Sequence, residues 1–264
     1  MSNQKRSGVY VTGICLCMFV FMMIGKTLSA QSDWQRAYDG FTEGKKRQAY
    51  AGGTLHTIID LVDIDDDGDL DLFAGSVQKI SFFRNDGTEY KFLYTQVTED
   101  FTGFEKSSST AYASPAFTDI DSDGDQDMFF GHYPGGIWFV ENEGDSVNYI
   151  FNEGNSNYQG IDVGTGCKPT FVDIDNDGDQ DLFCGREASA TITFFENTGT
   201  SVSASFSNVT GSYGGISISS IGGSEYLVPR FCDIDNDGDL DLVIGEYCLG
   251  RDYVHFYRND GTPE

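Results

Sequence analysis

Residues 63–71 read DIDDDGDLD, and nearly the same nonapeptide returns as DIDSDGDQD at 119–127, DIDNDGDQD at 173–181 and DIDNDGDLD at 233–241. Successive copies begin 56, 54 and 60 residues apart. Self-similarity at a nearly fixed period is typical of repeat architectures, in which each copy forms one structural unit. The chain is therefore expected to fold as four similar units.

The similarity extends to both sides of each nonapeptide. Three copies follow a Pro-x-Phe stretch (PAFT at 115, PTFV at 169 and PRFC at 229), and the first follows IDLV at 59. Downstream come LFAG, MFFG, LFCG and LVIG, and then FFRNDG, FVENEG, FFENTG and FYRNDG. Short apolar runs rich in aromatic and β-branched residues read as strands, and the Asn-x-Gly endings read as tight turns.

A fourth, weaker run precedes each unit, at 34–41, 92–101, 149–158 and 203–213. Four short strands in a repeat of this length indicate a blade of a β-propeller. The predicted fold is all-β, a propeller of four-stranded blades with units near 34–87, 92–144, 149–199 and 203–261. Four units fit either a partial ring within a longer protein or a four-bladed ring that the 34–41 strand closes.

The charge of the chain excludes several partners. Its 264 residues include 16 Lys and Arg against 42 Asp and Glu, a net charge of −26. A nucleic acid or an anionic membrane surface is bound by clustered basic residues, so neither is an expected partner. With 39% hydrophobic residues the chain can still form a core.

Residues 1–30 have the features of a secretory signal peptide. Lys5 and Arg6 precede an apolar run from Val9 to Ile24, and small residues stand before a cleavage point at Gln31. The run is short for a retained membrane anchor, which needs about 20 residues. The mature chain, residues 31–264, is expected to be secreted or displayed at the cell surface, with no membrane insertion after cleavage.

Export would determine whether the cysteines of the mature chain can form disulfides. These cysteines are Cys167, Cys184, Cys232 and Cys248. An oxidising compartment permits one or two disulfides, and four cysteines allow three pairings. The alternative is four buried free thiols.

The nonapeptide has the pattern of a loop that binds a hard cation. In the first copy Asp63, Asp65 and Asp67 stand at positions 1, 3 and 5, and Gly68 permits a sharp turn. The backbone carbonyl of Asp69 and the side chain of Asp71 would complete the oxygen ligands. The corresponding candidates are Asp119, Asp121, Asp123, Asp125, Asp127, Asp173, Asp175, Asp177, Asp179, Asp181, Asp233, Asp235, Asp237, Asp239 and Asp241. The isoleucine at position 2 of every copy is expected to point into the core.

Several considerations favour Ca²⁺, one ion per loop and about four in all. Each loop offers only oxygen ligands, so a zinc site is excluded. Mg²⁺ seldom uses an all-protein cage, and an EF-hand needs a glutamate at its twelfth position, where apolar residues and a cysteine stand here. The alternative is a metal-free surface turn. Calcium is expected to be structural, joining strands within each blade.

The pattern PxFxDIDxDGDxDLFxG resembles the FG-GAP/VCBS repeats of bacterial secreted and surface proteins, which are related to the integrin α-subunit propeller. The resemblance implies a calcium-binding propeller that acts in cell adhesion, recognition or extracellular scaffolding, alone or as part of a larger multidomain protein. An extracellular protein or glycan is the expected ligand. The segments 102–114, 159–168 and 211–226 differ most between units and are the candidate ligand-binding loops.

An enzyme is the alternative. The sequence has no GxSxG, P-loop or HExxH motif, and its three histidines hold no common place in the repeat. A calcium-rich propeller is similar to the fold of some polysaccharide lyases. A calcium-dependent polysaccharide-processing enzyme therefore remains an alternative function. A calcium-saturated spacer of short Asp-rich repeats fits less well, because strand-rich intervals separate these loops. No catalytic residue is therefore assigned.

Overall fold

A computed structural model describes residues 57–76, 79–88, 91–101, 113–133, 135–187, 191–218, 226–248 and 251–261. These residues form strands joined by loops, together with two short 3-10 turns at Tyr158–Gly160 and Tyr213–Gly215. The proposed signal peptide lies outside the described residues, as does the 34–41 run. Within the described part of the chain no helix is long and apolar enough to span a membrane.

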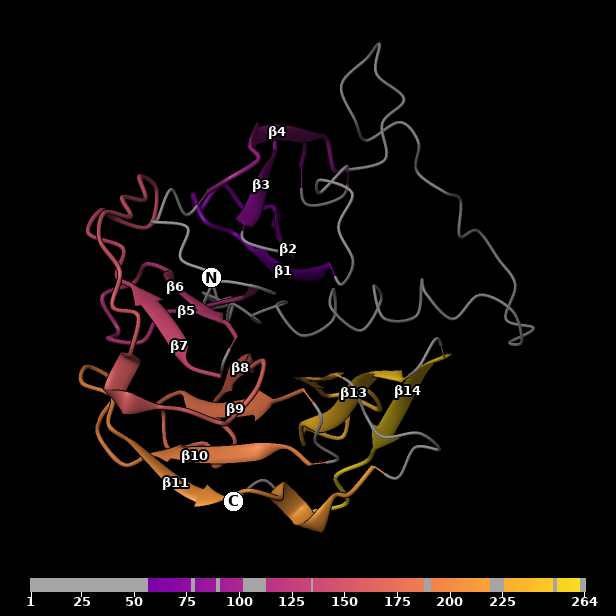
Figure 1. The fold of residues 1–264 in the computed structure, drawn as a ribbon. Coiled ribbons are helices and arrows are strands. Elements are labelled where there is room, and N and C mark those ends of the chain that lie inside the picture. The colour runs from indigo at the N-terminus through magenta and orange to yellow at the C-terminus, as the bar shows by residue number, and fades with distance from the viewer. Residues whose placement is uncertain are drawn as a thin grey trace, which may run out of the picture.

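The strands form four antiparallel sheets, which follow one another around the molecule (Figure 1). The first sheet has β1 (Ile58–Val62), β2 (Asp71–Ser76), β3 (Lys79–Asn85) and β4 (Tyr94–Thr98). The second has β5 (Ser114–Thr118), β6 (Asp127–Gly131) and β7 (Ile137–Val140). The third has β8 (Lys168–Val172), β9 (Asp181–Gly185), β10 (Thr193–Asn197) and β11 (Phe206–Thr210), and the fourth has β12 (Tyr226–Cys232), β13 (Asp241–Cys248) and β14 (Arg251–Tyr257).

This arrangement confirms the predicted propeller blades and shows where each outer strand belongs. The run at 92–101 supplies β4, which pairs with β3 of the preceding unit, and the run at 203–213 supplies β11 in the same way. The run at 149–158 makes only isolated bridges, Asn142 with Phe151 and Phe139 with Asn155. The first three sheets therefore take their outermost segments from residues that the repeat pattern assigns to the next unit, whereas the fourth sheet has three described strands.

Aromatic side chains fill the space between consecutive sheets. Phe73 of β2 stacks on Phe82 of β3 at 4.5 Å between ring centroids and lies 4.4 Å from Phe117 of β5, in the next sheet. The same contact recurs between Phe129 and Phe171 at 4.4 Å. It recurs again between Phe183 and Phe231 at 4.5 Å. The phenylalanine of each Pro-x-Phe stretch thus packs on the preceding sheet.

Each second strand contains a glycine in its second half, and in the first three sheets the neighbouring sheet requires it. A Cβ atom on Gly75, Gly131 or Gly185 would lie 2.1 Å from a backbone carbonyl oxygen just ahead of the next sheet's Pro-x-Phe stretch. Around Gly245 the nearest described atoms belong to Val228 of its own sheet, at 4.0 Å. The repeated glycine is therefore explained by close approach between sheets.

Within the part of the chain that the structure describes, no shared strand closes the four sheets into a ring. Among the described residues, no strand of the first sheet pairs with a strand of the fourth. Ile64 is only 2% exposed because the second sheet covers it, whereas Ile234 is 45% exposed. The expectation that every position-2 isoleucine is buried is thus wrong for the fourth copy, where no described sheet covers the side chain, and Ile174 of the third copy is only partly buried.

Candidate metal centres

Each nonapeptide connects the first strand of a sheet to the second and wraps around its first aspartate. Asp63 accepts hydrogen bonds from the backbone nitrogens of Asp67 at 3.1 Å and Gly68 at 3.0 Å. The equivalent bonds recur at 3.1–3.2 Å around Asp119, Asp173 and Asp233. The glycine at position 6 has φ between +91° and +101° in the four loops, as the sequence predicts.

Position 4 also takes the left-handed conformation, which the sequence analysis did not address. Asp66, Ser122, Asn176 and Asn236 stand there with φ between +52° and +60°. Asn and Asp tolerate this conformation better than other side chains. The residue type at position 4 therefore reflects the left-handed backbone conformation of the loop and does not indicate a metal ligand.

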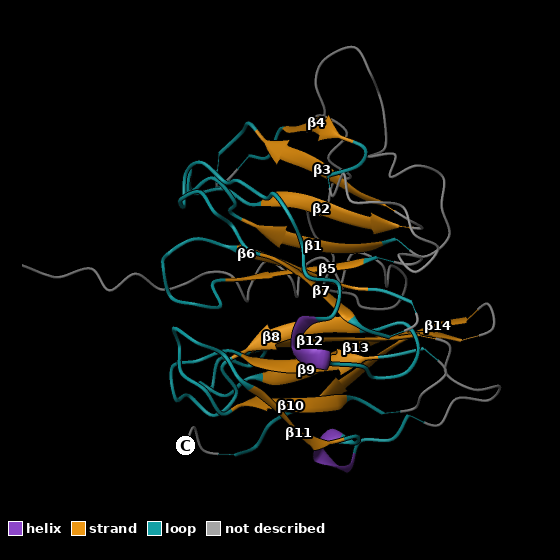
Figure 2. Ribbon diagram, turned by 60° about the vertical axis from the view of Figure 1, so that its left-hand side comes forward, coloured by secondary structure: helices purple, strands orange, loops and turns teal. Residues whose placement is uncertain are grey.

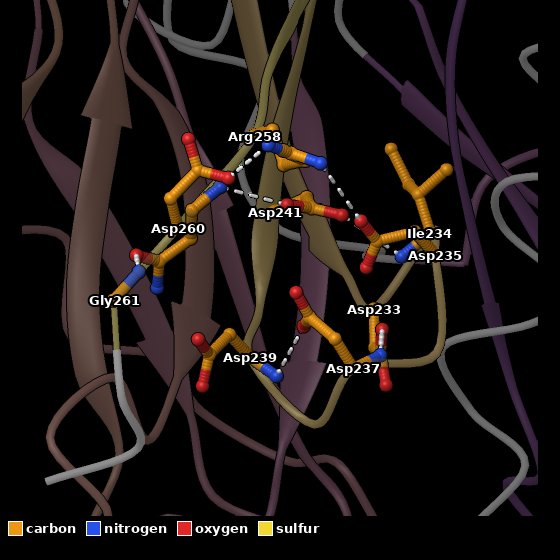
Figure 3. A network of polar contacts seen from close by, with 10 residues as sticks. Asp233, Ile234, Asp235, Asp237, Asp239, Asp241, Arg258, Asp260 and Gly261 are labelled. Atoms are coloured by element: carbon orange, nitrogen blue, oxygen red, sulfur yellow. Dashed lines mark hydrogen bonds and ion pairs between the residues drawn. The ribbon is translucent and has the colours of Figure 1, made fainter.

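The loops gather carboxylates as predicted. In each of the first three loops the aspartates at positions 1, 3 and 5 place one oxygen each within 4.8 Å of one another. In the fourth loop the converging set is Asp233, Asp235 and Asp241, at positions 1, 3 and 9 (Figure 3). A cation held there would be surrounded by carboxylate oxygens, the ligands of a hard divalent ion.

The aspartate at position 7 is buried in every loop. Asp69, Asp125, Asp179 and Asp239 are each at most 7% exposed, and their Oδ1 atoms have no hydrogen-bond partner. Burial, followed by repulsion from neighbouring aspartates, raises the pKa of Asp69 and Asp125 to about 6. The loop pattern predicted a ligand role only for the backbone carbonyl of this residue. Its buried side chain is a further ligand candidate.

The aspartate at position 9 joins three parts of each sheet. Asp71 opens β2, and its Oδ1 accepts a hydrogen bond from the backbone nitrogen of Asn85 in β3 at 2.6 Å. The equivalent bonds measure 2.7–2.8 Å at Asp127, Asp181 and Asp241. The second oxygen of Asp241 accepts from Ile234 within the loop, at 3.0 Å. In the first and third loops this second oxygen is buried without a partner.

The asparagine whose backbone nitrogen donates to the position-9 aspartate also positions the loop. The sequence pattern indicated only that this asparagine belongs to a turn. The side-chain oxygen of Asn85 accepts from Gly87 at 3.2 Å and Leu93 at 2.7 Å. Asn142, Asn197 and Asn259 make the equivalent bond to the glycine two residues on, at 3.1 Å. In the first three units the candidate metal loop is thereby fixed to the outer segment of its sheet, and the recurring Asn-x-Gly was the signal.

The electrostatics of the loops favour a bound cation. Burial, with a smaller contribution from neighbouring aspartates, raises the pKa of Asp71 and Asp127 to about 7, although backbone hydrogen bonds to these carboxylates lower it. Such shifts mean that the ionised carboxylates are unfavourable without a counter-charge. Orphaned buried oxygens together with an all-carboxylate ligand set fit a hard divalent cation.

The surroundings of the four loops differ in charge. Arg258 lies 3.7 Å from Asp235 of the fourth loop and also pairs with Asp260 (Figure 3). Arg84 holds the same place beside the first loop, where its charge lowers the pKa of Asp65 against the larger effect of burial. Glu141 and Glu196 stand at this place in the second and third repeats. The loops are therefore not electrostatically equivalent.

Comparison with known proteins identifies the repeat. The family described as FG-GAP-like repeat matches three times, over residues 63–130, 119–184 and 173–244. The chain belongs to the FG-GAP-like repeat family. Each match to the FG-GAP repeat begins at a metal loop and runs into the second strand of the next sheet, so every matched stretch contains two loops.

No curated protein matches the chain. Among solved structures, an Agrocybe aegerita lectin is similar, and its structure is described as specific recognition of non-reducing terminal N-acetylglucosamine. It is 19% identical with a TM-score of 0.41, and the alignment covers 76% of this chain and 51% of that chain. The FG-GAP chain thus spans about half the length of this lectin.

Proposed function

We propose that the chain is a secreted calcium-binding FG-GAP module that acts in adhesion or recognition of an extracellular protein or glycan. The observation that carries the calcium assignment is the recurrence, in four loops, of converging carboxylates with a buried, unpartnered oxygen at position 7. Four independent copies of one ligand arrangement favour a common ion. The size and flexibility of the all-oxygen loop favour Ca²⁺ over Mg²⁺.

Calcium in this proposal has a structural role. Within each loop the candidate ligands span the turn from the first strand to the second, and position 9 is tied to the third strand. An ion there would fix three strands of one sheet together and offset the repulsion between carboxylates. The fold would then present its remaining loops on a rigid base.

We assign the ligand-binding role to the loops at the strand ends that lie away from the candidate metal loops. Figure 2 shows loops at both ends of the strands. In the third sheet Val172 pairs with Asp181 at the metal end, and Lys168 pairs with Gly185 at the other. The segment 159–168 enters there. Parts of the other two candidate segments, residues 102–112 and 219–225, lie outside the described residues.

The segment 159–168 has the rigidity that a binding loop needs. Arg186 donates to the carbonyl oxygen of Val163 at 2.8 Å, and Thr165 donates through its hydroxyl to the carbonyl oxygen of Glu187 at 2.9 Å. The backbone nitrogen of Glu187 donates to the Thr165 carbonyl oxygen at 2.8 Å. These bonds attach the loop to the end of β9, so a ligand would meet a preformed surface.

The calcium proposal is tested by thermal unfolding of residues 31–264 in 2 mM Ca²⁺, in 2 mM Mg²⁺ and in excess EDTA, with calorimetric ion stoichiometry. A calcium-specific rise in Tm with about four ions per chain is expected. Equal Tm values in Ca²⁺ and EDTA would reject the assignment. Screening the calcium-loaded protein against glycans and surface proteins tests recognition, and exchange of 159–168 for a Gly-Ser linker should abolish any binding found.

We also propose that the module is not catalytic. The closest arrangement to a catalytic pair in the described residues is His255, whose Nε2 lies 2.7 Å from Oε2 of buried Glu246. One such pair is an ordinary structural contact without a nucleophile beside it. Turnover of an acidic or neutral polysaccharide by the calcium-loaded protein, lost in H255A, would overturn this part of the proposal.

A further inference from the structure

Two thiols meet inside the third sheet. Cys167 directly precedes β8 and Cys184 lies on β9, and both side chains are fully buried. Their Sγ atoms are 3.2 Å apart and both thiols are free. The strand register places the contact, because Pro169 pairs with Cys184 and Cys167 stands two residues before Pro169.

The other sheets show what this place in the fold otherwise contains. The positions equivalent to Cys167 and Cys184 hold Ala113 with Phe130 in the second sheet and Leu227 with Ile244 in the fourth. Those residues are buried hydrophobic side chains. The repeat therefore needs only apolar packing here, and a pair of mutually contacting sulfur atoms is a departure from it.

We infer that Cys167 and Cys184 form a disulfide in the exported protein. The inference goes beyond calcium binding and rests on the proposed export, because disulfides persist in oxidising compartments. The two thiols lose two protons and two electrons as the S–S bond forms. A small-molecule disulfide such as oxidised glutathione accepts the electrons by thiol–disulfide exchange and leaves as two thiols.

The bond would enclose the third metal loop, because residues 173–181 lie between the two cysteines. A cross-link restricts the unfolded chain and so favours the compact form of the segment that it closes. Calcium in the third loop favours the same form. By linkage, oxidation should strengthen calcium binding at this loop, and calcium should favour the disulfide by an equal factor.

The bond is tested on the full chain after equilibration with reduced and oxidised glutathione, acid quenching, blocking of free thiols and mass spectrometry. Lys168 precedes Pro169, a bond that trypsin leaves intact, so a protease that cleaves at aspartate is needed to separate the cysteines. A peptide pair linked through Cys167 and Cys184 is expected. Recovery of both residues as blocked thiols at high oxidised glutathione would overturn the inference.

A matched variant keeps the test independent of folding. In C167A/C184A each new alanine has a precedent at the equivalent position, Ala113 in the second sheet and Ala74 in the first. This variant should keep its β-sheet circular dichroism and lose the linked peptide. If it lost its fold, the linked peptide of the unmodified chain would still decide the question.

The coupling to calcium is measured separately. The oxidised fraction at a fixed glutathione ratio should rise several-fold in Ca²⁺ compared with Mg²⁺, and D173N should remove this rise. An oxidised fraction that is the same in both ions would overturn the coupling. Failure of the calcium proposal would appear instead as absent ion binding in calorimetry, with the linked peptide unaffected.

Discussion

Arg230 of β12 donates a hydrogen bond from Nη2 to the backbone carbonyl oxygen of Ile59 in β1, at 3.3 Å, and so joins the fourth sheet to the first. Its Nη1 atom donates to the hydroxyl of Thr170 in β8 at 2.6 Å. Asp60, next to Ile59, accepts from the backbone nitrogen of Phe117 in β5 at 3.0 Å. These bonds link the first strands of all four sheets.

The residues involved hold one place in the repeat. Asp60, Ala116, Thr170 and Arg230 each stand immediately before the Leu or Phe that precedes the metal loop by two residues. An acidic residue in the first unit thus meets a basic residue in the last. Burial raises the pKa of Asp60 to about 6, and the charge of Arg230 lowers it. The charge of Arg230 in the fourth sheet thus acts on a carboxyl group of the first sheet.

Removing this arginine should destabilise the fold. R230Q removes the guanidinium that donates to Thr170 and Ile59 and whose charge acts on half-buried Asp60, and we expect a loss on the order of 2 kcal/mol in the free energy of unfolding. D60N in the same chain should recover much of that loss. Urea denaturation of the two single variants and the double variant measures the coupling. Strict additivity would contradict the proposed pairing, and R84Q on the exposed surface serves as the control.

Asp63 should be needed for binding of the calcium ion at the first loop, whereas Asp66 of the same loop should not be needed. D63N removes a converging carboxylate and the acceptor of two loop hydrogen bonds, so calorimetry should find three ions where the unmodified chain binds four. At a calcium concentration a hundred times Kd, the lost site corresponds to about 2.7 kcal/mol of stabilisation. D66N is the matched control, because Asn occupies this position in the third and fourth loops. Equal stoichiometry in both variants would refute the ligand assignment.

Arg258 should weaken calcium binding at the fourth loop. Its guanidinium lies 3.7 Å from Asp235 and competes with an ion for that carboxylate. Since an exposed ion pair is weak and is screened by salt, R258Q should raise the affinity of this loop by roughly two- to five-fold at low salt. Calorimetry at low and high ionic strength checks this. K91Q, which removes a charge from the first sheet, should leave the fourth loop unchanged.

Calcium should reverse the dependence of stability on pH. In the metal-free protein, burial and then mutual repulsion or other charges shift the pKa of several carboxyls to about 6 or 7, above the value of about 3.9 in an unfolded chain. These carboxyls are Asp60, Asp69, Asp71, Asp125, Asp127 and Asp181. The native state then binds more protons than the unfolded state between about pH 4 and 7, so stability falls as pH rises through this window.

With calcium bound, the loop carboxylates are ionised in the native state, and stability should instead rise over the same window because protons compete with the ion. Urea denaturation at intervals from pH 4.5 to 8, in EDTA and in Ca²⁺, compares the two slopes. Parallel slopes would mean that the loops do not bind the ion through these carboxylates.

Gly185 should not tolerate a side chain. A Cβ atom there would lie 2.1 Å from the carbonyl oxygen of Leu227, so G185A must push the third and fourth sheets apart. We expect a loss of roughly 3 kcal/mol or more, the upper range for overpacking. Gly211 has open space around it, and G211A should change stability little. Thermal unfolding followed by circular dichroism distinguishes the two, and similar Tm values would show that the sheets can separate freely.

The sequence by itself determined the repeat, the four-sheet architecture and the metal loops. These features are local: a nonapeptide with acidic residues at alternate positions and glycine at the sixth folds back on its own first aspartate whatever surrounds it. The same locality explains why the sequence correctly predicted the roles of Asp63 and Gly68, and of their equivalents in the other copies.

Only the tertiary structure decided which distant side chains meet and how deeply each is buried. The pairing of Arg230 with the first sheet, the meeting of Cys167 with Cys184 and the burial of the Asp69 side chain depend on how the sheets pack and twist. The exposure of Ile234, against the burial of Ile64, depends on whether another sheet follows. A repeat pattern makes its copies equivalent, whereas packing gives each copy different neighbours, and those neighbours set burial, charge and contact.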